Sequence, residues 1–380
     1  MKILFLDQSG KLGGAELCLL DIAKLYRESC LVGLFADGSF RQILNQHQVP
    51  VQVLTTDSIA VRKNSSLVQS LGSLRQLVPL ITKVARLSRD YDLIYANTQK
   101  ALVVGALASL LSKRPLVYHL HDILSLEHFS PINCRLAIAL ANRFAALVIA
   151  NSQASQTAFV AAGGKRDITQ IVYNGFSPQL YQHLKSNSLQ VRQHLGIQEQ
   201  FVVGHFSRLS PWKGQHILIE ALASCPSEIT AMFVGDALFG EQDYVEKLHQ
   251  QVARLGLEQR VRFLGFRSDV PQLMAACDLV VHTSTAPEPF GRVIVEAMLC
   301  GTPVVAANAG GVVELIDCGK TGWLVAPSHP QQLAEAIATC RNQPENAAKI
   351  AEQARIQASQ RFDESVINQQ IVKLIDQLVV

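Results

Sequence analysis

Short runs of apolar residues recur along the whole chain, and most of them are apolar at nearly every position. This pattern is typical of strands that are buried on both faces, as in parallel sheets. The predicted strands in the first half are 2–6, 31–35, 51–54, 92–96, 116–119, 146–150 and 170–173. Those in the second half are 201–206, 230–234, 262–264, 278–282, 303–306 and 322–325.

Segments with apolar residues at helical spacing lie between many of these strands. The clearest are 15–27, 215–223, 244–255, 293–300 and 331–340. Alternation of strand and helix predicts parallel sheets with helices on both faces. Two such series in one chain indicate an α/β protein of two doubly wound domains, which we expect to face each other across a cleft.

The domain boundaries follow from turn residues and polar composition. Asn174-Gly175 and Ser177-Pro178 open a polar stretch, so we place a linker at 175–200. The first domain is then 1–174 and the second is 201–355. Residues 356–380 read as a C-terminal helix that can pack back on the first domain.

Composition excludes several classes of protein. The chain has 380 residues, of which 48% are hydrophobic and 17% charged, which is neither a disordered chain nor a coiled coil. No C-x-x-C pair occurs among the eight cysteines, which argues against zinc ribbons and thioredoxin-like chemistry. No apolar segment reaches the roughly 20 residues of a membrane span, and the apolar start is too short for a secretory signal. We therefore expect a cytoplasmic protein.

Charge is divided unevenly between the halves. Residues 1–190 carry 19 Lys and Arg against 11 Asp and Glu, whereas 191–380 carry 15 against 20. Between Asp57 and Asp90 there are six cations and no acid, interleaved with apolar residues at helical spacing. This basic segment, 58–89, predicts either peripheral contact with an anionic membrane at its inner face or a helix that packs its apolar side into the first domain. The basic half lacks aromatic interleaving and any nucleic-acid module, so no nucleic acid is expected.

Ligands of open parallel sheets bind beyond the carboxyl ends of the strands, so we searched the loops there. Gly13-Gly14 follows the first strand and opens a helix, where it can let a ligand approach the backbone, although an ordinary turn has the same glycines. Arg208 and Lys213 lie in a loop before a helix, which suits a diphosphate; the alternative is a solvated basic loop.

A third candidate is the string from Glu288 to Met298. Pro289 and Gly291 keep its front out of a helix, which can begin near Arg292 and carries Glu296 in its first turns. Carboxylates at such positions accept hydrogen bonds from vicinal hydroxyls. The alternative for Glu296 is a purely structural one, in which an acid complements the helix dipole.

The fourth candidate is His119-Leu120-His121-Asp122, at the end of a strand. Two histidines at this spacing share a strand face and could bind a metal, but no convincing further ligand is apparent in the sequence. His121 could instead orient a polar substrate, or both could be ordinary core or surface histidines. We expect no metal site. No nucleophile elbow of the G-x-S-x-G type occurs.

Together these strings resemble the family-4 retaining glycosyltransferases, which have the GT-B fold of two Rossmann-like domains. The resemblance covers positions 13 to about 326. Its most specific parts are the E-x7-E element, met by Glu288 and Glu296, and the Arg208/Lys213 loop. The other matching strings are Gly13-Gly14-Ala15-Glu16, His121-Asp122, Asn174-Gly175 and Gly301-Thr302-Pro303-Val304-Val305.

The resemblance implies a retaining, metal-independent transfer of a hexose-type sugar from a UDP- or GDP-linked donor to a glycan, lipid-linked or other hydroxyl acceptor. No cofactor besides the nucleotide-sugar co-substrate is implied. The alternatives are a sugar-nucleotide epimerase of the same fold and a non-catalytic nucleotide-sugar-binding protein. The intact pair Glu288/Glu296 argues against the last.

The resemblance also assigns roles. Catalytic roles fall on His121, Glu288, Arg208 and Lys213. Donor-binding roles fall on Gly14, Arg208, Lys213, Phe266, Arg267, Glu288, Phe290, Gly291, Arg292, Val293 and Glu296. Arg208 and Lys213 would hold the diphosphate, Glu296 the ribose, Glu288 and the Phe290–Val293 backbone the sugar, the Phe266-Arg267 backbone the base, and His121 the sugar near its reacting carbon. Two positions depart from the family: Ser207 replaces a frequent Gly, and Arg292 replaces a small or aliphatic residue, so Arg292 would either meet an anionic sugar or point to solvent.

Overall fold

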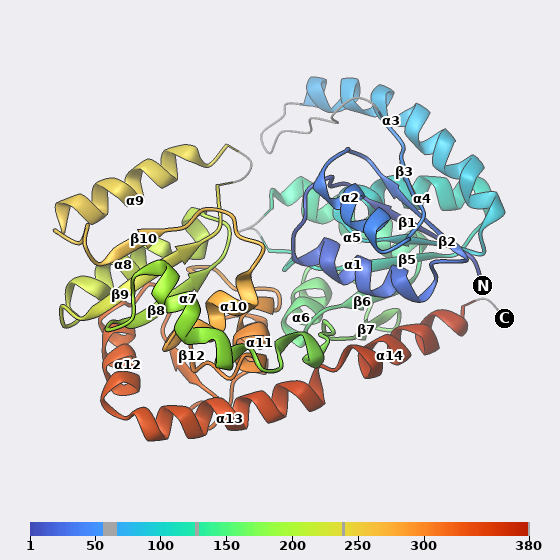
Figure 1. Cartoon of the computed structure of the whole chain (residues 1–380). Helices are drawn as coiled ribbons and strands as arrows, with labels where there is room; N and C mark the ends of the chain where they lie inside the picture. The colour runs from blue at the N-terminus through green and yellow to red at the C-terminus, as the bar shows by residue number, and fades with distance from the viewer. Residues whose placement is uncertain (56–66, 126–128, 238–239, 379–380) are drawn as a thin grey trace. The chain divides into compact units, whose positions relative to one another are not determined.

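The computed structural model describes residues 1–55, 67–125, 129–237 and 240–378, with side chains in the helix α3 described from Leu77 on (Figure 1). It divides into two compact units, residues 1–175 with 364–380, and residues 176–363. Each unit contains one parallel sheet flanked by helices, so the prediction of two doubly wound α/β folds is confirmed. Among the described helices, none has both the length and the apolar character needed to cross a membrane.

The sheet of the first unit has seven strands in the order β3-β2-β1-β4-β5-β6-β7, all parallel. The strands are β1 (Ile3–Asp7), β2 (Cys30–Leu34), β3 (Val51–Val53), β4 (Leu93–Ala96), β5 (Leu116–Leu120), β6 (Ala145–Ala150) and β7 (Thr169–Ile171). The helices are α1 (Gly14–Leu25), α2 (Ser39–Gln46), α3 (Leu67–Leu87), α4 (Gln99–Ser112), α5 (Pro131–Phe144), α6 (Gln153–Ala161) and α14 (Glu364–Asp376).

The central strand β1 shows how the apolar pattern builds two cores. Leu4 and Leu6 join the cluster on one face with residues of α3, α4 and α5, while Ile3 and Phe5 join the other with residues of α1, α2 and α14. Successive side chains of a strand point to opposite faces, so an uninterrupted apolar run serves both layers. These strands are therefore covered by helices on both sides.

The described part of α3 packs its apolar side inward. Leu80, Ile81 and Val84 are buried in the first core cluster, and the Lys83 ammonium donates to the Leu54 carbonyl over 2.9 Å. This is the packing alternative stated for the 58–89 segment. Residues 58–66 of that segment lie outside the described residues, and membrane contact remains a prediction.

The sheet of the second unit has six parallel strands in the order β10-β9-β8-β11-β12-β13. They are β8 (Phe201–Phe206), β9 (Ile229–Val234), β10 (Val261–Phe263), β11 (Leu279–His282), β12 (Val304–Ala307) and β13 (Trp323–Val325). The helices are α7 (Ser188–Leu195), α8 (Gln215–Ala223), α9 (Gln242–Arg254), α10 (Val270–Ala276), α11 (Arg292–Leu299), α12 (Pro330–Asn342) and α13 (Pro344–Arg361).

The predicted linker 175–200 differs from what the structure shows, because most of it folds within the second unit. α7 lies in this stretch, and Arg192 joins it to the segment between α10 and β11 through an ion pair of 3.0 Å with Asp278 and a hydrogen bond to the Ala276 carbonyl. The apolar pattern did not predict this contact, because no residue of α7 is buried and the polar side chain of Arg192 makes these bonds.

The predicted single helix 356–380 is also two helices. α13 ends at Arg361 in the second unit, and α14 begins at Glu364 in the first. Between them Phe362 is buried against Phe290, and Asp363 forms a bridge with Phe176. Ile367, Ile371 and Ile375 of α14 then pack into the first unit, as the helical spacing allows.

Candidate functional site

Both sheets have a point where strand order reverses, and ligands of such folds bind at the carboxyl ends of the strands there. In the second unit this point lies between β8 and β11. The loop after β8 carries Arg208 and Lys213, and the loop after β11 leads to Glu288. The topology therefore brings three of the predicted residues to one edge of one sheet.

Hydrogen bonds from a buried polar side chain fix the loop between β8 and α8. Gln215 is fully buried, and its Nε2 donates to Ser207 Oγ over 2.8 Å and to the Arg208 carbonyl over 2.9 Å. Gly214 has φ +71°, and a Cβ there would lie 2.0 Å from the Thr283 carbonyl oxygen. Ser207 thus supports the loop, and glycine at 214 permits the close approach of the loop to Thr283, the residue after β11.

Lys213 and Glu288 form the central ion pair of the site. Lys213 Nζ lies 2.7 Å from Glu288 Oε2, which is also 3.1 Å from His282 Nε2 and accepts from Ser284 Oγ over 3.0 Å. Burial alone would raise the pKa of Glu288, but Lys213 and His282 outweigh it and hold that pKa well below its usual range. The site therefore presents a buried, ionised carboxylate beside an ammonium group.

The backbone of Glu288 is held by the turn after β12. Gly311 donates its N–H to the Glu288 carbonyl over 2.7 Å, and Gly310 forms a bridge with Glu288. Gly310 has φ +69°, and a Cβ there would lie 2.3 Å from the Glu288 carbonyl oxygen. Only glycine fits this close approach, so the pair Gly310-Gly311 fixes the loop that carries the carboxylate.

Arg292 does not point to solvent. Its side chain is 14% exposed, its guanidinium lies over the Phe176 ring at 4.4 Å from the centroid, and its Nε is 3.6 Å from Glu296 Oε1. Burial raises the pKa of Glu296, and Arg292 opposes that rise. The structure thus contradicts the solvent alternative, since Arg292 acts within the site as the cation beside Glu296.

Arg208 faces an acid from the start of α9. Its Nε lies 3.6 Å from Glu241 Oε2, while Glu241 Oε1 accepts from Ser210 Oγ over 2.6 Å. Both side chains of the ion pair are about one-third exposed, at 30% and 27%. Arg208 is therefore accessible to an incoming anion and is held in place by an acid that the sequence analysis did not single out.

The remaining predicted residues of the second unit lie around the same edge or at the next strand. Gly291 precedes α11 with φ +100°, Val293 lies in the first turn of α11, and Phe290 is buried and stacks on Phe176. Phe266 is 67% exposed after β10, and Arg267 forms a bidentate pair with Asp269. The structure gives these residues positions without testing the roles predicted for them.

In the first unit the strand order reverses between β1 and β4. Asp7 ends β1, Asn97 follows β4, and both are fully buried. Asn97 Oδ1 lies 2.9 Å from His121 Nε2, and Gly14 opens α1 in the loop after β1. The predicted residues His121 and Gly14 are thus brought to one edge, together with Asn97, which follows a predicted strand, and with Asp7, an acid that sequence reasoning missed.

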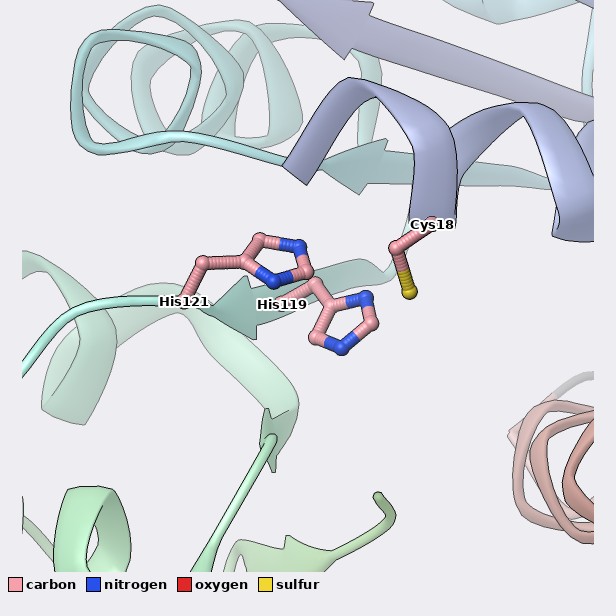
Figure 2. Close-up of side chains that lie close together, drawn as sticks. All are labelled: Cys18, His119 and His121. Carbon is pink, nitrogen blue, oxygen red and sulfur yellow. The ribbon is translucent and has the colours of Figure 1, made fainter. Parts of the chain in front are cut away.

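Three potential metal ligands gather in the first unit, as Figure 2 shows. Atoms of Cys18, His119 and His121 lie within 4.8 Å of one another. Cys18 lies in α1, about one hundred residues before the histidines, so the sequence did not indicate that it lies beside them. The two imidazole rings lie with their centroids 3.9 Å apart, and the angle between the ring planes is 37°. The structure thus adds a third potential ligand to the two histidines, and the expected absence of a metal site stays a prediction.

Asp7 and Glu16 are two buried acids near each other. Burial raises the pKa of Asp7 to about 6, and burial together with Asp7 and Asp122 raises the pKa of Glu16 to about 8. The unfolded chain ionises Glu16 near its ordinary value of 4.5, whereas the folded chain keeps its proton until about pH 8. Stability therefore falls as pH rises between these values.

Replacing Glu16 with Gln should remove this loss. Gln keeps the shape and the acceptor oxygen but has no charge to bury, so we expect a higher melting temperature at pH 8 and little change at pH 5. Thermal unfolding of both proteins across this pH range measures the effect, with the exposed pair-forming acid Glu352→Gln as the control. An equal shift at both pH values would contradict the assignment.

The residues that the sequence analysis missed act mainly on other side chains. They are Asp7, Glu241, His282, Gly310 and Gly311. Asp7 and His282 are the last residues of β1 and β11, and the others lie in loops that follow a strand. Their position was a usable signal, but their partners lie on strands that are distant in sequence.

Comparison with known proteins extends over nearly the whole chain. Residues 12–180 match the sequence profile described as Glycosyltransferase Family 4, and residues 188–357 match the profile of Glycosyl transferases group 1. Spore coat protein SA of Bacillus subtilis is 32% identical over 52% of this chain and 55% of its own. D-inositol 3-phosphate glycosyltransferase of Corynebacterium glutamicum is 27% identical over 70% of this chain and 67% of its own. For the first of these and for the N-acetyl-alpha-D-glucosaminyl L-malate synthase of Bacillus anthracis, the chain spans about half of the relative's length.

Solved structures agree with this. Anabaena Alr3699/HepE in complex with UDP-glucose is 63% identical, with a TM-score of 0.93, over 99% of this chain and 100% of that one. The same protein is known in complex with UDP and glucose, at 64% identity. Sucrose-phosphate synthase from Thermosynechococcus elongatus has a TM-score of 0.84 at 20% identity, which shows a shared fold.

Proposed function

Because this chain belongs to the family-4 glycosyltransferases, we propose that it transfers glucose from UDP-glucose to a hydroxyl of a glycan or lipid-linked acceptor, with retention of anomeric configuration and without a metal ion. The identity of the donor rests on the 63% identical Anabaena protein, whose structure contains UDP-glucose. It narrows the prediction of a UDP- or GDP-linked donor.

The observation that carries the proposal is the buried pair Lys213–Glu288 at the switch point of the second unit. A buried carboxylate that stays ionised is a strong acceptor for sugar hydroxyls. The ammonium beside it is suited to a phosphate oxygen, and Arg208 after β8 can add a second cation. One edge of one sheet therefore offers groups for both parts of a sugar diphosphate.

The proposed reaction breaks the bond between the anomeric carbon and the diphosphate oxygen. Negative charge develops on the leaving UDP, and Arg208 and Lys213 stabilise it electrostatically. The acceptor hydroxyl forms the new bond on the same face of the sugar, and its proton passes to the departing phosphate oxygen. This path needs no separate protein base, and retention follows from attack on the face that the diphosphate leaves.

Glu296 is proposed to accept the ribose hydroxyls, as the resemblance assigns it. Burial raises the pKa of Glu296, and Arg292, 3.6 Å away, opposes that rise and so favours the ionised form, which accepts hydrogen bonds. For Phe266, Arg267, Gly14 and His121 the roles given by the resemblance stay predictions.

Ligand binding and turnover test the proposal directly. We expect UDP and UDP-glucose to raise the melting temperature more than GDP-mannose or ADP-glucose, because a ligand that binds only the folded state stabilises it. We also expect slow release of α-glucose from UDP-glucose in the presence of EDTA, followed by proton NMR of the anomeric signal. No UDP binding, or release of β-glucose, would overturn the donor or the retaining mechanism.

The same assay separates the two alternatives. An epimerase would interconvert UDP-sugars without releasing UDP, and a binding protein would bind UDP-glucose and release nothing. Coupled detection of free UDP distinguishes both from a transferase.

A further inference from the structure

Asn97 lies at the centre of a buried hydrogen-bond chain in the first unit. It is fully buried, and its Nδ2 lies 2.7 Å from Asp7 Oδ2 and 3.1 Å from the Ala15 carbonyl oxygen. Its Oδ1 lies 2.9 Å from His121 Nε2. The chain thus runs from the end of β1, through the residue after β4, to the residue after β5.

The chemistry of the partners decides which way the Asn97 amide faces. A main-chain carbonyl oxygen only accepts hydrogen bonds, and so does an ionised Asp7. A flipped amide would place its oxygen 2.7 Å and 3.1 Å from two other oxygens. The amide nitrogen therefore faces Asp7 and Ala15, and the amide oxygen faces His121.

We propose that Asn97, oriented by Asp7, is a positioning residue that fixes the proton of His121 on Nε2. An amide oxygen has no hydrogen to donate, so His121 Nε2 must be the donor of this bond. Neutral His121 then carries its lone pair on Nδ1. The buried amide selects one of two tautomers that differ little in free solution.

A second contact fixes the plane of the His121 ring. The ring of His119 lies against it (Figure 2), with the ring centroids 3.9 Å apart. Tyr95 OH lies 2.8 Å from His119 Nδ1. Burial and the neighbouring His121 lower the pKa of His119 well below its ordinary value, so the ring that contacts His121 is neutral. Asn97 acts within the ring plane and His119 acts on its face.

The consequence for the reaction rests on the proposed function, in which His121 contacts the donor sugar. A histidine in one tautomer and one orientation offers a fixed acceptor and avoids reorganisation during the reaction. The tautomer itself is a property of the folded first unit and can be measured without any donor.

The first experiment is therefore spectroscopic. Protein labelled with ¹⁵N-histidine is studied by long-range ¹H–¹⁵N NMR at pH 8, and the His121 signals are identified by their loss in His121→Gln. We expect the Nε2–H tautomer in the wild-type protein and a mixture in Asn97→Ala. The Nδ1–H tautomer in the wild type overturns the proposal, whether or not any variant folds.

The second experiment measures release of glucose from UDP-glucose. Asn97→Ala should lower kcat about tenfold, with KM for UDP-glucose changed less than about twofold, because alignment and not binding is lost. Asn151→Ala is the matched control: Asn151 is another buried amide directly after a strand, β6, and accepts from Ser155 Oγ over 2.9 Å. It should leave the His121 signals and kcat nearly unchanged.

The two readouts separate the two hypotheses. An Nε2–H signal that becomes a mixture in Asn97→Ala, in a protein that releases no glucose, supports the positioning role and contradicts the proposed function. A signal that stays Nε2–H in a folded Asn97→Ala contradicts the positioning role alone. Equal losses of kcat in Asn97→Ala and Asn151→Ala, with an unchanged tautomer, would indicate a structural role and overturn the proposal.

Discussion

Replacing Lys213 with Met is expected to abolish glucose transfer and to lower the free energy of unfolding of the second unit by about 3–5 kcal/mol. The loss of stability follows from Glu288, whose side chain is 12% exposed and would be left as a buried charge without its 2.7 Å partner. The loss of activity, about 10³-fold, follows from removal of a cation beside the leaving diphosphate. Urea unfolding and UDP release measure the two effects separately.

A double variant shows that the two losses have different causes. Lys213→Met with Glu288→Gln has no unpaired charge to bury, so stability should return toward that of the wild type, while activity stays absent. Arg341→Met is a control, because it breaks the more exposed pair with Glu228 and should change stability by less than about 1 kcal/mol. If the double variant were as unstable as the single one, the ion pair would not be the cause.

Replacing Glu296 with Ala is the second change with a large expected effect. It removes the carboxylate proposed to accept two ribose hydroxyls, so KM for UDP-glucose should rise about 100-fold or more, with affinity for UDP reduced in parallel. Calorimetry with UDP and initial rates over a range of donor concentrations measure both. Glu335→Ala, at an exposed acid on α12, is the matched control.

Replacing Arg292 should weaken donor binding by a smaller amount and in a pH-dependent way. Arg292→Met leaves Glu296 buried without its nearby cation, so its pKa should rise further and donor affinity should fall as pH decreases, more steeply than in the wild type. Tight UDP binding by Glu296→Ala at wild-type affinity would contradict the ribose assignment and, with it, the role given to Arg292.

The strands could be predicted from the sequence because a strand that is buried on both faces has apolar residues at nearly every position. Every predicted strand has a counterpart in the structure. The alternation of strands with helices was sufficient to predict two doubly wound sheets. The E-x7-E string and the Arg208/Lys213 loop could be found in the sequence because each is one short segment that follows a predicted strand.

The residues that contact these site residues could not be predicted from the sequence. Lys213 and Glu288 are 75 residues apart, and Asp7 and Asn97 are 90 apart, yet each pair is joined by a contact of 2.7 Å. Parallel strands bring such residues together only through strand order, which local patterns do not encode. No sequence motif includes His282, Glu241 or Cys18. The role of such a single residue depends on the residues that contact it in the folded chain.

The sequence by itself thus determined the fold class of each unit and the edges at which chemistry lies, since hydrophobic period and strand ends are local properties. The tertiary structure alone decided the charge state of Glu288, the inward position of Arg292 and the orientation of the Asn97 amide. These depend on burial and on the exact donors and acceptors around each group, which chain segments distant in sequence supply together.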